Sequence, residues 1–115
     1  MKIAILGSGI GGLSTAIALK LKGFNVDVYE RHHKANDIGA GLVCWPNATF
    51  VLEQLGVLAQ VAKVSGRPAA MTRFSSDGSL LTSLDINQLN RQMNYPSYAI
   101  LRSELLKILE RRALA

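Results

Sequence analysis

The first thirty residues switch between strand-like and helix-like hydrophobic patterns. Lys2–Leu6 is a nearly continuous apolar run, which predicts a strand buried on both faces of a parallel sheet. From Gly12 to Lys22 the apolar residues fall at helical spacing, and Gly23 is placed to end that helix in a left-handed cap. Asn25–Tyr29 alternates and predicts a second strand. The expected apolar face of the helix consists of Leu13, Ala16, Ile17 and Leu21. Together these segments predict a βαβ unit with a right-handed crossover.

The remaining pattern predicts two further helices and a hairpin. Residues 36–44 are glycine-rich and are expected to be irregular. A helix is expected from Pro46 to a stop at Gly56, and another over Ser103–Leu114. Asp77-Gly78 between two strand-like runs predicts a hairpin over Met71–Ile86. The apolar residues noted in the two predicted helices are Phe50, Val51 and Leu55 in the first and Leu105, Leu106 and Leu109 in the second.

Length and composition limit the chain to one modest folded domain, and the βαβ pattern above makes it one of the α/β class. It has 115 residues, of which 49% are hydrophobic and 18% charged. The net charge of +5 is scattered rather than clustered among aromatic residues, so a nucleic-acid partner is not expected. No run is long enough to span a membrane, and we expect a cytoplasmic protein.

Cysteine and histidine usage argues against a disulfide framework and against a metal site. Cys44 is the single cysteine and is expected to be a small core residue. His32 and His33 have no cysteine or carboxylate at ligand spacing, so they are interpreted as a polar strand end.

A glycine motif, Gly7-x-Gly9-x-x-Gly12, follows the first predicted strand and opens the first predicted helix. Each glycine has its own task in a dinucleotide-binding turn. Gly7 allows the tight turn, Gly9 lets a pyrophosphate approach the backbone, and Gly12 lets the helix pack closely on the sheet. The helix N-terminus would supply N–H groups and partial positive charge to the diphosphate.

Glu30 strengthens this interpretation because it ends the second predicted strand, at about the 20-residue distance from Gly9 that the fingerprint requires. A carboxylate there accepts hydrogen bonds from the adenosine ribose and favours a free 2′-hydroxyl over a 2′-phosphate. The alternative is a glycine-rich turn of another α/β protein, with Glu30 an ordinary solvent-facing residue. The fingerprint implies an ADP moiety, from either FAD or NAD.

Two segments behind the fingerprint carry a family resemblance. Gly39–Val57 (GAGLVCWPNATFVLEQLGV) and Ala99–Leu109 (AILRSELLKIL) resemble the FAD-dependent aromatic hydroxylases, single-component flavoprotein monooxygenases that include 4-hydroxybenzoate and salicylate hydroxylases. The resemblance covers almost the whole chain. It implies that residues 1–115 are the N-terminal part of a Rossmann-type FAD-binding domain, incomplete relative to the full family fold. The C-terminal flavin and substrate regions of the family are absent, and Asp77-Gly78 is not the family's Asp-Gly motif.

The resemblance also implies an FAD site. Glu30 would bind the adenosine ribose, with Arg31 beside it or merely a solvated charge. Gly41 would approach the flavin and ribityl chain. Arg102 would lie on the pyrophosphate or ribityl side, where its planar fork suits phosphate, although it could be an ordinary helix-start cation. The pyrophosphate would lie on Gly7, Ser8, Gly9, Ile10, Gly11 and Gly12.

The implied activity of the complete family is hydroxylation of a small, usually aromatic, substrate with NAD(P)H and O₂, in which FAD carries the chemistry. No residue of this chain is a convincing general acid or base, so we name no catalytic residue. Trp45 and Tyr98 are assigned to packing rather than to the cofactor. An uncovered parallel sheet predicts exposed apolar edges, and therefore either self-association or dependence on a missing partner segment. Two alternatives remain, another FAD- or NAD-linked oxidoreductase and a non-catalytic nucleotide-binding module.

Overall fold

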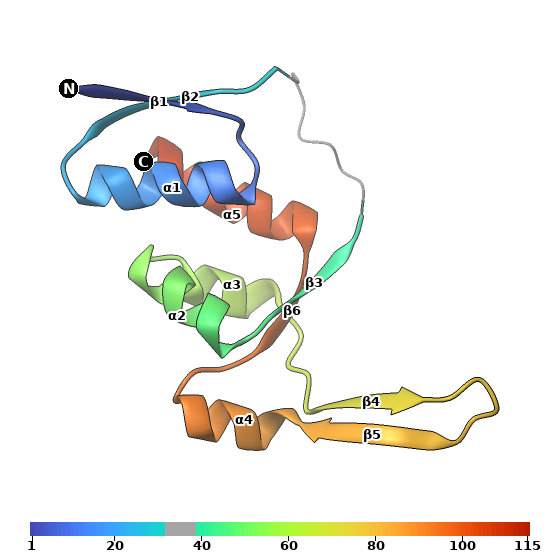
Figure 1. Cartoon of the computed structure of the whole chain (residues 1–115). Helices are drawn as coiled ribbons and strands as arrows, with labels where there is room; N and C mark the ends of the chain where they lie inside the picture. Colours follow the sequence, from blue (N-terminus) through green and yellow to red (C-terminus); the bar gives the residue numbers. More distant parts are fainter. Residues whose placement is uncertain (32–38) are drawn as a thin grey trace.

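The computed structural model describes residues 1–31 and 39–115 (Figure 1). The predictions for His32 and His33, and for the start of the glycine-rich segment at Asn36–Ile38, lie outside these residues. The helices in the described part are α1 (Ile10–Leu21), α2 (Pro46–Gln54), α3 (Leu58–Val64), α4 (Ile86–Met93) and α5 (Arg102–Leu114). The strands are β1 (Lys2–Leu6), β2 (Asn25–Tyr29), β3 (Gly41–Cys44), β4 (Ala70–Phe74), β5 (Leu80–Asp85) and β6 (Tyr98–Leu101).

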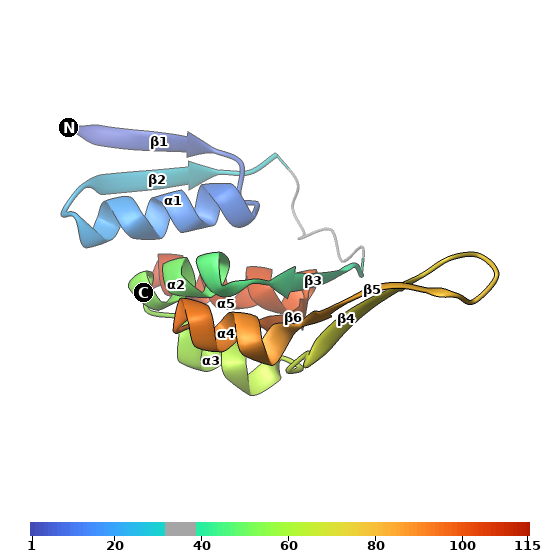
Figure 2. The same cartoon turned by 60° about the horizontal axis from the view of Figure 1, so that its bottom comes forward.

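The βαβ unit is confirmed. β1 and β2 pair in parallel, from Lys2 opposite Asn25 to Leu6 opposite Tyr29. α1 packs between this strand pair and α5 (Figure 2). The left-handed cap is confirmed as well, because Gly23 has φ +88°. The amides of Gly23 and its successor donate to the carbonyl oxygens of Lys20 and Leu19, at 2.9 and 3.1 Å, which completes a Schellman motif.

The expected burial of β1 on both faces is wrong. Only Ile3 and Ile5 are even partly buried, while Leu6 is 85% exposed. The reason is that α1 covers one face of the strand pair and no described element covers the other (Figure 2). Leu21 also departs from the predicted apolar face: it is exposed because it lies at the very end of α1, whereas Leu13, Ala16 and Ile17 are buried.

The core lies between α1, α5, α2, α3 and the β3–β6 pair. The three leucines predicted for the last helix are buried there, and Leu55 joins them. Phe50 and Val51, two apolar residues of the predicted helix, are about half exposed, because α2 turns Thr49 and Leu52 inward. Pro46 at the first position of α2 and the stop at Gly56, with φ +80°, are confirmed.

Part of the segment predicted to be irregular is a strand. β3 pairs antiparallel with β6, Gly41 lying opposite Leu101. The sequence does not reveal this pairing because each strand has four residues, too few to show an alternation. α3 and α4 were not predicted either, since helices of seven and eight residues carry barely two turns of periodicity.

The predicted hairpin is confirmed and projects from the body of the molecule (Figure 1). β4 and β5 pair antiparallel, and Gly78 takes φ +89° in the turn. Every residue of both strands is exposed, including the apolar side chains of Phe74, Leu80 and Leu81.

Asp77 in this turn provides a pH prediction. Hydrogen bonds from the Ser75 hydroxyl and the Ser79 amide lower the pKa of Asp77 to about 2. A depressed carboxyl pKa contributes stability above its unfolded value of about 4, and that contribution is lost as the pH falls toward 2. Carboxyl NMR of the folded chain should therefore place the Asp77 midpoint near 2, and Ser75→Ala should raise it. A wild-type midpoint near 4 would contradict these bonds.

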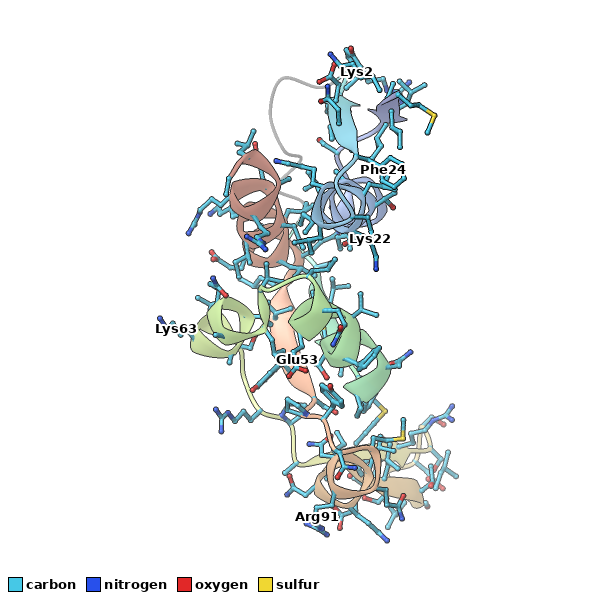
Figure 3. All side chains as sticks on the ribbon, turned by 90° about the vertical axis from the view of Figure 1, so that its left-hand side faces the viewer. Lys2, Lys22, Phe24, Glu53, Lys63 and Arg91 are labelled. Atoms are coloured by element: carbon cyan, nitrogen blue, oxygen red, sulfur yellow. The ribbon has the colours of Figure 1, made fainter. Side chains whose placement is uncertain are left out.

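The molecule is elongated. Its radius of gyration is 16.7 Å, against about 13 Å expected for a compact chain of this length. Its accessible surface is 7819 Å², against about 6,100 Å² for a compact protein of this mass. Lys2 on β1 and Arg91 on α4 mark opposite ends (Figure 3). No helix of the described part is both long and apolar enough to cross a bilayer. The uncovered strand pair and hairpin account for apolar residues exposed at both ends.

Candidate functional site

The glycine loop joins the carboxyl end of β1 to the start of α1 (Figure 1). Gly7 has φ +107°, a backbone conformation that residues with a side chain rarely adopt. Its amide donates to the carbonyl oxygen of Tyr29, the last residue of β2, at 2.7 Å. This bond ties the loop to the end of the neighbouring parallel strand, the edge at which open α/β sheets bind ligands. It also brings Glu30, the next residue, beside the loop.

Gly9 and Gly12 differ in what surrounds them. A Cβ at Gly12 would lie 2.0 Å from the carbonyl oxygen of Gly7, so no side chain fits between the loop and α1 there. A Cβ at Gly9 would meet nothing within 4 Å. The fold therefore does not itself require a glycine at position 9, and the open space over this backbone is where a phosphate can approach. This is the fit that a dinucleotide needs.

The N-terminus of α1 is arranged to face an anion. Gly9 is the N-cap, in an extended conformation, and makes no side-chain capping bond. The first turn contains no acidic residue. The amide of Leu13 makes the first helical bond, to the carbonyl oxygen of Gly9 at 2.9 Å. The amides of residues 10–12 precede it and, as in any helix, have no partner within the helix. Their partial positive charge favours a phosphate.

Glu30 lies against the loop. Its Oε2 accepts hydrogen bonds from the Ser8 amide at 2.8 Å and from the Ser8 hydroxyl at 3.1 Å. The carboxylate is exposed and sits one residue beyond β2, as predicted. It is thus placed at the carboxyl end of β2, next to the backbone that precedes α1.

Glu30 is among the residues that line two hollows. Each hollow has a volume of about 460 Å³, which is within the usual range of ligand pockets. One also contains Gly7 and Arg31, which places Arg31 beside Glu30 as expected. Leu6 and Tyr29 complete this hollow and were not predicted as site residues. The sequence could have identified both as site residues, because each is the last residue of a predicted parallel strand, and ligands of such sheets bind at the carboxyl ends of the strands.

Gly41 and Arg102 form a second group. Gly41 opens β3, and the amide of Arg102 donates to the carbonyl oxygen of Ala40 at 2.9 Å. Arg102 is half-buried at the first position of α5. α1 and α5 start at the same side of the molecule in both views, so the group lies at the same end of the helix pair as the glycine loop (Figures 1 and 2). Within residues 1–31 and 39–115, no hydrogen bond or ion pair joins Arg102 to the loop.

Of the three residues assigned to packing, Tyr98 and Cys44 lie in the core, as predicted. Tyr98 is 7% exposed in the core, with the Arg67 guanidinium 5.9 Å from its ring centre. Cys44 is a free, buried thiol whose pKa is raised by burial. Trp45 is half-buried and precedes α2 as its N-cap.

Comparison with known proteins identifies relatives of this site. The pattern of the NAD(P)-binding Rossmann-like domain family matches residues 5–44, which contain the glycine loop and Glu30. An FAD-dependent urate hydroxylase of Mycolicibacterium vanbaalenii is 33% identical over 106 residues, covering 91% of this chain and 27% of the relative. A 2-heptyl-3-hydroxy-4(1H)-quinolone synthase of Mycobacteroides abscessus is 37% identical over 84 residues, covering 73% of this chain and 22% of the relative.

Solved structures agree over nearly the whole chain. The tetrameric form of 2-methyl-3-hydroxypyridine-5-carboxylic acid oxygenase superposes with a TM-score of 0.84 at 30% identity, covering 98% of this chain and 29% of that one. The HpxO protein of Klebsiella pneumoniae, complexed with FAD and uric acid, gives a TM-score of 0.81 at 30% identity. The match covers 96% of this chain and 28% of that one. The chain thus spans between a fifth and a third of the length of these relatives.

Proposed function

The chain belongs to the FAD-dependent monooxygenases, and from this premise we propose that its glycine loop and Glu30 bind the ADP half of FAD. The single observation that carries the proposal is the open position over Gly9, which directly follows Ser8, the residue that donates to the Glu30 carboxylate. A diphosphate over Gly9 would meet the N-terminus of α1, and the adjoining ribose would reach Glu30.

The remaining candidate residues take their roles from this placement. Arg31 would lie beside the adenosine ribose, since it lines the same hollow as Gly7 and Glu30. Gly41 and Arg102 would contact the pyrophosphate, ribityl or flavin end, because α5, which Arg102 opens, starts on the same side as α1 (Figure 1), and the Arg102 amide binds the carbonyl oxygen of Ala40, next to Gly41. The pyrophosphate itself would lie on Gly7, Ser8, Gly9, Ile10, Gly11 and Gly12.

We propose that residues 1–115 form part of a Rossmann-type FAD-binding domain, and that the complete protein hydroxylates a small aromatic substrate with NAD(P)H and O₂. Two of the relatives above, named as a urate hydroxylase and as a hydroxypyridine-carboxylic acid oxygenase, support this reaction class. FAD supplies the redox chemistry when bound, and this chain orients it.

We also propose that the uncovered strand edge of β1 and β2 supports association of the protein with itself. Leu6 is 85% and Tyr29 55% exposed at the end of that pair. A strand edge with unpaired backbone groups is a template for further pairing.

The test is titration of the purified chain with FAD, followed by flavin fluorescence. Wild-type chain should bind saturably. Glu30→Gln should weaken binding at least tenfold, because hydrogen bonds to a charged group contribute about 1.5–3 kcal/mol each. FMN, which lacks the adenosine ribose, should not respond to the substitution.

Glu104→Gln serves as the matched control, since Glu104 is in the first turn of α5 with its carboxylate 3.7 Å from the Lys107 ammonium. It should bind FAD as the wild type does. A folded chain that binds no FAD, or a Glu30→Gln variant with undiminished affinity, would contradict the proposal.

A further inference from the structure

The side chain of Ser8 is bound to the residue proposed to hold the ribose. Its hydroxyl and its amide both donate to Oε2 of Glu30, at 3.1 and 2.8 Å. Ser8 belongs to the glycine loop and Glu30 follows β2, so these two bonds join parts of the chain 22 residues apart. Hydrogen bonds to an ionised acceptor are the stronger class. The contact therefore fixes the direction of an otherwise exposed carboxylate.

The two donors of Ser8 differ in what they require of the sequence. Any residue except proline supplies the amide at position 8, whereas the hydroxyl needs serine or threonine. An exposed glutamate loses rotamer freedom when a ligand orders it. A carboxylate that is already oriented in the free protein loses less on binding.

We infer that Ser8 is a positioning residue for Glu30, and that its hydroxyl raises affinity for adenosine diphosphates that carry ribose hydroxyls. The inference rests on the proposed function, because it requires Glu30 to meet the ribose. It assigns the Ser8 hydroxyl an effect on ribose recognition, beyond the backbone contact to the diphosphate expected of this loop.

The probes are ADP and 2′,3′-dideoxyadenosine 5′-diphosphate, which has the same base and diphosphate but no ribose hydroxyls. Affinities of the full 115-residue chain would be measured for wild type, Ser8→Ala, Glu30→Gln and the double variant. Ser8→Ala should weaken ADP binding about fivefold and change dideoxy-ADP binding by less than twofold. In the Glu30→Gln background, Ser8→Ala should have no further effect. Ser8→Thr, which keeps the hydroxyl, should restore most of the affinity, and Ser14→Ala serves as control.

An equal loss for both nucleotides would overturn the inference, because it would mean that Ser8 acts on the diphosphate or on the loop as a whole. Additive effects of Ser8→Ala and Glu30→Gln would overturn it too. Amide exchange of the free chain gives a readout without ligand: Glu30→Gln should speed exchange of the Ser8 amide, and unchanged exchange would contradict the contact. If the folded wild type binds neither nucleotide while this amide is protected, the proposed function fails and the inference fails with it.

Discussion

Gly12→Ala should destabilise the chain by about 3 kcal/mol or more, a large share of the 5–15 kcal/mol that holds a typical domain together. The added Cβ would lie 2.0 Å from the Gly7 carbonyl oxygen, 3.0 Å from its carbon and 3.5 Å from the Ile5 Cγ2. Two of these atoms belong to backbone, so no rotamer change relieves the overlap. α1 must move away from β1, or the loop must open. Urea unfolding followed by circular dichroism would measure the loss.

Gly11→Ala is the matched control. It lies one residue earlier in the same helix, and a Cβ there would meet nothing within 4 Å. Alanine is the better helix former by about 1 kcal/mol in a helix interior, so this variant should be as stable as the wild type or slightly more stable. Equal stability of the Gly11→Ala and Gly12→Ala variants would show that α1 does not pack on the loop as closely as described.

The difference between these neighbours shows what the sequence could and could not predict. The motif predicted the tight packing at Gly12, because that glycine has the same task in every turn of this kind. β1, β2, the Gly23 cap and the hairpin were also predictable, since each has a signal within a few residues: an apolar run, an alternating run, a glycine at the end of a helix and Asp-Gly between two strand-like runs. β3 and β6 depend instead on a pairing across more than fifty residues, which a local pattern does not reveal.

Burial was the least predictable property. An apolar run such as Lys2–Leu6 has the composition of a strand covered on both faces, yet α1 covers only one face of it here. The apolar residues of α2 do not all turn inward either: Phe50 and Val51 are about half exposed, because the direction of α2 is set by its contacts with α3 and β3. At the site, spacing placed Glu30 correctly. The contact between Ser8 and Glu30 required the Gly7–Tyr29 bond, which only the folded chain contains.

Gly9→Ala should leave the fold intact and abolish most of the nucleotide affinity. A Cβ at Gly9 meets no atom of the chain within 4 Å, and the residue has φ −75°, which alanine adopts readily. The change in unfolding free energy should be about 1 kcal/mol or less, mainly because alanine is a poorer N-cap than glycine. The same Cβ would occupy the space proposed for the FAD pyrophosphate, so affinity should fall at least tenfold, which corresponds to about 1.4 kcal/mol.

Gly9→Ser separates the two effects. Serine is a favoured N-cap, so this variant should match or exceed the stability of the Gly9→Ala variant while its Cβ blocks the phosphate equally. Fluorescence titration with FAD beside urea unfolding of both variants would test this. Tight FAD binding by either variant would place the pyrophosphate elsewhere than over Gly9. Loss of binding together with loss of fold would mean that Gly9, like Gly12, serves packing. Weakened binding in a stable chain is the one result that supports the proposed roles, in which Gly12 maintains the fold and Gly9 admits the ligand.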